Sequence, residues 1–171
     1  MLKAFVDAFS TLTLATTGPD GPWAAALFFA RDEALNLYFI SSPKSRHVRN
    51  LGADRRVCVT VNGDHDDWFD IRGLQIDGVA EYIAPAQRDE VAEYYLSRFS
   101  DLRRIVSEPG TAAEHKIAAA FQASEFIRVR PQFIRLIDNT RGFGTSIEFV
   151  LEAGSGDSKG HEPAHPAGPE S

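Results

Sequence analysis

The stretch LNLYFISSPKSRHVRNL, residues 35–51, joins an apolar, strand-like run to a short segment that is rich in serine and basic residues. Its first part belongs to a predicted strand over residues 34–41, because aromatic and branched apolar residues favour strands. Ser42 is suited to the N-cap position and Pro43 to the first helical position, so we predict a short helix directly after this strand. The order of elements on either side of this strand–helix pair indicates the fold.

Hydroxyl groups and positive charge gather at the start of this predicted helix, although the whole chain carries a net charge of −6. A helix start offers unpaired backbone N–H groups and the positive end of the helix dipole, and both favour an anion. An arginine fork also fits phosphate oxygens. Taken alone, the residues leave two interpretations open, a phosphate site and a solvated surface turn. The cluster comprises Ser41, Ser42, Lys44, Ser45, Arg46, His47 and Arg49.

Most of the first half of the chain alternates between polar and apolar residues, which is typical of half-buried strands. We predict strands over residues 11–17, 23–31, 34–41, 55–62, 68–83 and 125–139, and helices over residues 2–10, 84–106 and 111–124. Pro131 is expected to force a break or an edge position in the last strand. Sequential antiparallel strands with few crossover helices favour a closed or partly closed barrel over a parallel sheet. The expected fold is mainly β, with flanking helices.

The composition is that of an ordinary soluble domain, with 43% hydrophobic and 25% charged residues among 171. We assign residues 1–152 to one domain and residues 153–171, rich in Gly, Pro and Ser, to a disordered tail. The acidic net charge argues against nucleic acid as a partner. No apolar run approaches the roughly 20 residues of a membrane helix, and no signal peptide is evident, so we expect a cytoplasmic protein without a membrane partner. The single cysteine, Cys58, is expected to be a small buried residue.

Other segments give weaker signals. The segment DHDD, residues 64–67, is interpreted as a polar loop, because no matching metal-ligand spacing occurs elsewhere, and no metal site is expected. Hydrolase, kinase and nucleotide-loop motifs are not found, so no catalytic residue is assigned. The segment IRGLQIDG, residues 71–78, can form a bulged strand or a backbone that a flat ligand approaches, with Gln75 as a polar contact. The segment IDNTRGFGT, residues 137–145, can form a turn or a loop that meets a ligand.

Four segments together resemble a known family. PWAAALFFA (residues 22–30), LNLYFISSPKSRHVRNL (35–51), RVCVTV (56–61) and IRGLQIDGVAEYI (71–83) are similar, in order and spacing, to the flavin-binding split-barrel proteins related to pyridoxamine 5'-phosphate oxidase. The resemblance extends from about Ser10 to Phe149. IRLIDNTRGFG (134–144) resembles a less studied branch of the same superfamily.

This resemblance implies a split β-barrel of about six to seven antiparallel strands and a homodimer that binds two FMN molecules at its interface. It also implies an FMN-dependent oxidoreductase that acts on an unidentified small molecule. The superfamily includes haem and deazaflavin binders, so a carrier, sensor or reductase of the same fold is the alternative. The implied cofactor-binding residues are Ala25, Ala26, Leu27, Phe28, Ile40, Ser41, Ser42, Lys44, Ser45, Arg46, His47, Gln75, Asn139 and Arg141.

Three departures from the oxidase pattern affect the expected substrate. Ala25 stands where the oxidase usually has an arginine, and His47 replaces its phosphate-binding lysine. Gly73 stands where the oxidase has a glutamine, while Gln75, two residues on, faces the same side of the strand. We therefore do not expect oxidation of pyridoxamine phosphate. If His47 contacts phosphate as a cation, the affinity for FMN should weaken as the pH rises through the pKa of this residue.

Overall fold

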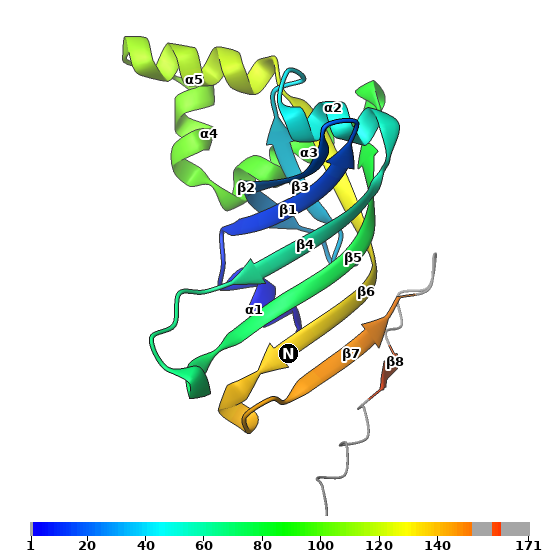
Figure 1. The fold of residues 1–171 in the computed structure, drawn as a ribbon. Helices are drawn as coiled ribbons and strands as arrows, with labels where there is room; N and C mark the ends of the chain where they lie inside the picture. Colours follow the sequence, from blue (N-terminus) through cyan, green and yellow to red (C-terminus); the bar gives the residue numbers. More distant parts are fainter. Residues whose placement is uncertain (1, 152–158, 162–171) are drawn as a thin grey trace, which may run out of the picture.

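A computed structural model describes residues 2–151 and 159–161 (Figure 1). Its strands are β1 (Thr11–Gly18), β2 (Gly21–Arg31), β3 (Leu37–Ser41), β4 (Arg56–Asn62), β5 (Arg72–Tyr82), β6 (Glu125–Asp138), β7 (Ser146–Val150) and β8 (Lys159–His161). Its α-helices are α1 (Leu2–Asp7), α2 (Arg46–Ala53), α3 (Arg88–Arg98), α4 (Ser100–Ser107) and α5 (Ala112–Gln122). Short 3-10 helices are η1 (Trp68–Asp70), η2 (Pro85–Gln87) and η3 (Asn139–Arg141).

Six antiparallel strands form a closed barrel in the order β3-β2-β1-β4-β5-β6, and pairing between β3 and β6 closes it. The long strand β6 is shared, because its first residues pair with β3 and residues 133–137 pair with β7. Strand β7 therefore extends the sheet outside the barrel, and β8 pairs with its outer side (Figure 1). The predicted mainly-β split barrel is confirmed. The remainder of the tail, residues 152–158 and 162–171, lies outside the described residues.

The barrel interior is filled by every second residue of its strands. In β4, for example, Val57, Val59 and Val61 are buried while the residues between them are exposed. Cys58 is one of those exposed residues, so the expectation of a buried cysteine was wrong. The reason is strand parity, because a residue beside an inward valine must point outward.

Pro131 lies within a continuous β6, so the predicted break does not occur. The pairing between β5 and β6 shifts register here, since Asp77 pairs with Phe133 whereas Gly78 pairs with Pro131. This bulge accommodates a residue that has no N–H for the ladder. Gly78 permits the close approach of the two strands, because a Cβ at this position would lie 2.6 Å from the carbonyl oxygen of Arg130.

Helices α3 to α5 cover the outer side of β2, β3 and β6 near one end of the barrel (Figure 1). The single helix predicted over residues 84–106 is divided at Phe99, where the backbone leaves the helical region. The ring of Phe99 packs against Tyr95 and Phe28, so tertiary packing rather than a helix-breaking residue divides the helix. Thr111 and Glu114 form a capping box at the start of α5. None of the helices in the described part of the chain could span a membrane.

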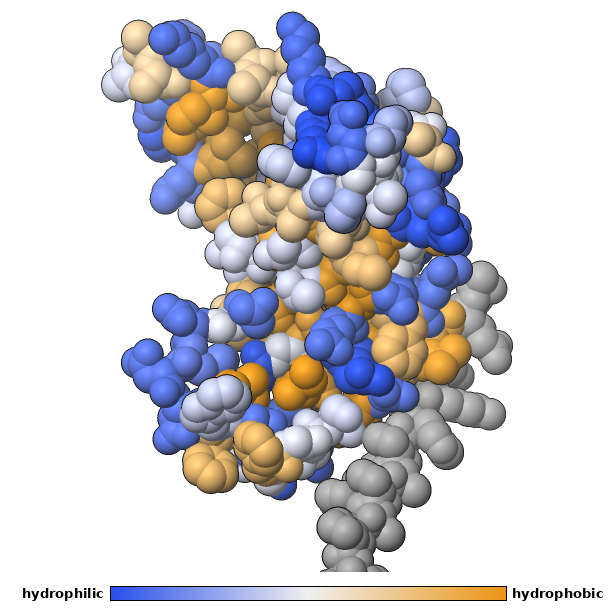
Figure 2. Space-filling view, viewed as in Figure 1, coloured by the Kyte–Doolittle hydropathy of each residue, from blue (hydrophilic) through white to orange (hydrophobic). Residues whose placement is uncertain are grey.

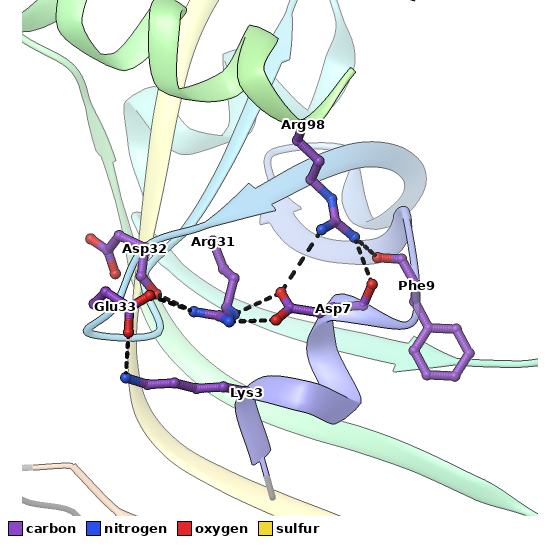
Figure 3. Close-up of polar contacts among 7 residues, drawn as sticks. All are labelled: Lys3, Asp7, Phe9, Arg31, Asp32, Glu33 and Arg98. Carbon is purple, nitrogen blue, oxygen red and sulfur yellow. Dashed lines mark hydrogen bonds and ion pairs between the residues drawn. The ribbon is translucent and has the colours of Figure 1, made fainter. Parts of the chain in front are cut away.

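A cluster of charged groups fixes α3 to α1 and to the end of β2 (Figure 3). The carboxylate of Asp7 accepts a 2.9 Å hydrogen bond from Nε of Arg31 and lies 3.8 Å from Nη1 of Arg98. Nη2 of Arg98 donates to the carbonyl oxygens of Asp7 and Phe9. The cluster therefore positions the C-terminal end of α3 beside β2.

Candidate functional site

The expected anion site lies where β3 ends and α2 begins. Helix α2 begins at Arg46 with Ser45 as its N-cap, so the prediction of Ser42 as N-cap and Pro43 as first helical residue was wrong. The intervening residues form a tight turn in which the N–H of Ser45 donates to the carbonyl oxygen of Ser42 over 3.0 Å. The Ser45 hydroxyl also donates to this carbonyl, and its oxygen accepts no hydrogen bond from the first N–H groups of α2. These donors face the turn without a side-chain acceptor.

Two serines and a histidine form a polar triangle at this helix start. Nε2 of His47 lies 2.7 Å from Oγ of Ser41 and 3.2 Å from Oγ of Ser45, and the two hydroxyl oxygens are 3.1 Å apart. Since the Ser45 hydroxyl donates to the Ser42 carbonyl, it can only accept from the other two groups. Either Nε2 of His47 or the Ser41 hydroxyl is the donor in the 2.7 Å contact between them, according to the tautomer of His47.

His47 is buried, with 7% of its surface exposed. Burial lowers the pKa of His47 below its ordinary value of 6.5, so the imidazole is neutral at physiological pH. The expectation that it contacts phosphate as a cation does not fit this environment. Its ring instead contacts the two serine hydroxyls through Nε2.

The guanidinium of Arg46 is folded over the β1–β2 turn. It lies 4.7 Å from the centre of the Trp23 ring, and its Nη2 donates a 2.7 Å hydrogen bond to the carbonyl oxygen of Asp20. Its Nε is buried and has no acceptor among the described residues. The turn thus holds the positive charge in place while one strong donor remains unused.

The remaining members of the basic cluster face solvent. Ser42, Lys44 and Arg49 are exposed, and Arg49 donates to the carbonyl oxygen of Lys44. Of the seven residues in the sequence cluster, Ser41, Ser45 and His47 contact one another, whereas Arg46, the first residue of α2, directs its guanidinium to the β1–β2 turn. The exposed side chains of Lys44 and Arg49 contribute positive charge near the site.

An unpaired strand edge runs beside the triangle. Pairing between β2 and β3 stops at Phe29 and Phe39, after which Ile40 and Ser41 pair only with β6. The N–H of Phe29 donates to Ser10 on the β1 side. Because strand hydrogen bonds alternate in direction, the backbone groups of Ala24, Ala26 and Phe28 point away from β1, towards the diverging β3.

The residues along this edge suit a flat ligand. Ala25 and Ala26 have minimal side chains, Leu27 is half-buried, and Phe28 is 60% exposed. The carbonyl oxygen of Phe28 already accepts a 3.2 Å hydrogen bond from the hydroxyl of Tyr95, which leaves the neighbouring groups available. The edge and the serine–histidine triangle together form an elongated surface with an anion-binding end and a planar, polar end.

Three residues of the sequence-based set do not join this group within one chain. Gln75 is exposed on the outer barrel face, in a row with Thr60, Thr13 and Ala26 on neighbouring strands. Asn139 and Arg141 follow the last residue of β6, whereas Ser41 pairs with its first residue, Glu125. They therefore lie at the opposite end of the barrel (Figure 1).

Asn139 has a different environment from the anion site. It is 7% exposed, its Nδ2 donates 2.7 Å to the carbonyl oxygen of Trp68, and its Oδ1 accepts 3.1 Å from the N–H of Gly144. Its backbone N–H donates to the carbonyl oxygen of Ile71. Asn139 thus joins the β4–β5 loop to the β6–β7 loop.

Sequence reasoning missed Trp23, Asp20 and Tyr95 as neighbours of the site. Trp23 and Asp20 contact Arg46, and Tyr95 binds the β2 edge. The Gly-Pro turn at residues 18–22 indicated a hairpin. Its contact with α2, which begins about 25 residues later, could not be predicted from the local sequence. The described residues contain no group of three or more His, Cys, Asp or Glu side chains arranged for a metal ion.

The chain matches a known protein family over most of its length. The sequence model for pyridoxamine 5'-phosphate oxidase matches residues 1–137. A UPF0306 protein from Klebsiella pneumoniae is 26% identical over 145 residues, which cover 84% of this chain and 87% of that protein.

Solved structures with the same fold differ in what they bind. A conserved hypothetical protein from Mycobacterium tuberculosis superposes with a TM-score of 0.65 at 26% identity, covering 82% of this chain and 84% of that one. A haem-binding protein from Mycobacterium smegmatis gives 0.64 at 17% identity, over 85% and 55%. An FAD-binding protein from Mesorhizobium loti gives 0.58 at 20% identity, over 77% and 88%.

Proposed function

Because the chain belongs to the pyridoxamine 5'-phosphate oxidase family, we propose that its elongated surface binds FMN and that the protein is an FMN-dependent oxidoreductase for a small molecule. The phosphate would lie at the start of α2, and the ring would lie along the free edge of β2. The FAD-binding relative in the same fold is consistent with a flavin.

Unused donors at the start of α2 carry this proposal. Nε of Arg46 is buried without an acceptor, and the first N–H groups of α2 have no side-chain cap. A buried donor that is left unsatisfied costs about 1–3 kcal/mol, so this arrangement favours an incoming anion. The phosphate of FMN supplies several acceptor oxygens and a negative charge for these groups.

The chain contributes binding and orientation to the proposed activity. Bound FMN would supply the redox chemistry. Arg46 and Ser41 would hold the phosphate, and His47 would keep the serine hydroxyls in their binding orientation. The backbone groups of Ala24 and Ala26 would align the ring. This division of labour requires no acid–base pair from the protein, and none is evident at the site.

A homodimer is the second part of the proposal. The middle of the outer face of β1, β2 and β4 exposes small, uncharged side chains in register, bordered by Gln75 and Asp77 of β5, and this patch suits close packing of two identical faces about a two-fold axis. In such a dimer, Gln75, Asn139 and Arg141 would approach the site of the partner subunit. The residues of this face include Thr13, Ala15, Ala24, Ala26, Thr60 and Gln75.

A comparison of FMN with riboflavin tests the phosphate site. Riboflavin has the same ring but no phosphate, so we expect FMN to bind at least about 100-fold more tightly. Titrations followed by visible absorbance and by quenching of flavin fluorescence measure both affinities. Protein that is colourless when purified and does not take up added FMN would overturn the proposal.

Sedimentation velocity tests the dimer. Thr13→Arg places a charge in the middle of the proposed face, and we expect it to convert a dimer into a monomer. Lys116→Ala, an exposed change on α5 outside this face, serves as the control. A wild-type protein that sediments as a monomer would refute this part of the proposal.

Haem binding remains the alternative, because a structural relative binds haem. An axial ligand requires a free imidazole nitrogen, but Nε2 of His47 already contacts two serines. His115 is exposed on α5. A Soret band on haem addition that disappears in His115→Ala would favour haem over FMN. A deazaflavin that carries a phosphate would bind at the same site as FMN. A competition titration that compares the two affinities distinguishes these cofactors.

A further inference from the structure

A second cavity adjoins the β2 edge on the side away from β1. It has a volume of about 390 Å³ and lies between Phe28 of β2 and the junction of α3 with α4. Figure 2 shows hydrophobic residues, in orange, gathered where α4 and α5 project above a hollow in the molecular outline. The volume falls within the range of small-molecule sites in proteins.

Aromatic rings form most of the wall. Phe99 packs edge-on against Phe28 with ring centres 5.7 Å apart, and it lies 5.0 Å from Tyr95. Leu102 contributes an aliphatic surface from the first turn of α4. Aromatic edges and faces at these distances favour a planar ring as the occupant.

The polar groups of the cavity are limited to one side. The charge of Arg98 is already engaged, because its guanidinium donates to Phe9 and lies 3.8 Å from the carboxylate of Asp7 (Figure 3). Ser100 and Asp101 also line the cavity, and neither side chain has a hydrogen-bond partner within the described residues. The exposed Ser100 and Asp101 supply hydroxyl and carboxylate acceptors, although Nε of Arg98 is buried without a partner in the described part of the chain and the carboxylate of Asp101 lies near the charge of Arg104.

We propose that this cavity binds a planar aromatic molecule that carries a hydrogen-bond donor, with the ring packed against Phe28 and Phe99 and the donor directed to Ser100 and Asp101. Phe28 belongs both to the cavity and to the strand edge at which the flavin ring is proposed to lie. We therefore assign the cavity to the substrate of the proposed oxidoreductase. This assignment rests on the proposed FMN site, whereas the binding of an aromatic molecule in the cavity does not.

Indole and N-methylindole test the proposal as a matched pair, because they differ only in the N–H donor. Saturation-transfer NMR titrations of the full chain measure both affinities in the absence and presence of FMN. We expect indole to bind about fivefold more tightly than N-methylindole, the effect of one hydrogen bond. Ser100→Ala with Asp101→Ala should abolish this preference. Equal affinities in the wild type would overturn the proposed role of these two residues.

Two substitutions of the same kind locate the binding. Leu102→Arg fills the cavity and should reduce indole affinity at least about tenfold. Ile117→Arg introduces the same side chain at an exposed position of α5 that does not line the cavity, and indole binding should be unchanged. Undiminished binding in folded Leu102→Arg, or no binding in the wild type, would refute the inference. FMN titration of the same proteins separates the outcomes, since a protein that binds indole but not FMN contradicts only the proposed function.

Discussion

Asn139 and Arg46 lie at opposite ends of the barrel and use their hydrogen-bonding groups differently. At one end, Asn139 uses its amide nitrogen, its amide oxygen and its backbone N–H to join two loops. At the other end, His47 contacts two serines while the neighbouring Arg46 keeps a buried Nε without an acceptor. The side chain of Asn139 is complete in its hydrogen bonding, whereas Arg46 retains a donor for an additional group.

The completeness of its hydrogen bonds therefore distinguishes a structural polar residue from a binding residue. Buried polar groups are almost always paired, so an unused donor is a candidate contact for a ligand, and His65, Arg98 and Arg128 each carry such a nitrogen as well as Arg46. The resemblance assigned Asn139 and Arg46 to the same cofactor site. Their hydrogen bonds assign them different roles within one chain, and the following measurements test that distinction.

The largest expected effect is on folding. Asn139→Ala leaves the carbonyl oxygen of Trp68 and the N–H of Gly144 without partners, so we expect the free energy of unfolding to fall by about 3 kcal/mol. Urea denaturation followed by circular dichroism measures the change. Asn62→Ala, at an exposed asparagine on β4, should cost less than about 0.5 kcal/mol. If Asn139→Ala has normal stability but loses FMN affinity, Asn139 is a binding residue, and it belongs to the FMN site of the partner subunit.

Arg46→Ala should act mainly on binding. Loss of a charge-assisted contact to phosphate is expected to weaken FMN binding by about 2 kcal/mol, or roughly 30-fold. Riboflavin affinity should be unaffected, because riboflavin has no phosphate. Arg56→Ala, at an exposed arginine paired with Asp54, is the matched control and should bind FMN normally. If Arg46→Ala binds FMN as the wild type does, the unused Nε has no part in anion binding.

Ser41→Ala should have a smaller effect at the same end. It removes the hydroxyl that His47 contacts, and we expect about a fivefold loss of FMN affinity, or about 1 kcal/mol. Isothermal titration calorimetry resolves a change of this size. Ser97→Ala, at an exposed serine on α3, provides the control. A wild-type affinity in Ser41→Ala would leave the anion to Arg46 and the backbone alone.

The smallest expected effect concerns pH. Burial lowers the pKa of His47 in the folded protein, so the unfolded chain binds more protons as the pH falls below about 6.5. The contribution of His47 to stability is therefore present above this pH and is lost as the pH falls towards the lowered pKa. Unfolding at about pH 7 and pH 5 should show a difference that His47→Gln reduces. FMN affinity should be constant between about pH 7 and pH 8. A decline over this range would show that His47 contacts the phosphate as a cation.

Strand parity accounts for how much of the fold the sequence could predict. The alternation in RVCVTV correctly places Val57 and Val59 inside, and the same alternation places Cys58 outside. Composition suggested the opposite for Cys58, so the periodic pattern was the more reliable signal. The division of the predicted helix at Phe99 was not predictable, because it depends on packing against Phe28, which is 71 residues away in the chain.

The candidate site was predictable only in part. A basic, hydroxyl-rich helix start pointed to Ser41, Ser45 and Arg46, and the structure places these residues where β3 ends and α2 begins. The burial of His47 and the attachment of Arg46 to the β1–β2 turn depend on how α2 packs on the barrel. These tertiary contacts decide which charges are available, and a local sequence pattern does not contain them.

The two tryptophans of the chain give each end of the barrel its own optical reporter. Trp23 stacks on Arg46, and Trp68 lies in η1, where its carbonyl oxygen binds Asn139. Indole emission overlaps flavin absorption, so a flavin beside Arg46 would quench Trp23 by energy transfer more strongly than it quenches the distant Trp68. In Trp68→Phe the remaining emission would follow occupancy of the α2 end, and in Trp23→Phe it would follow loosening of the loops.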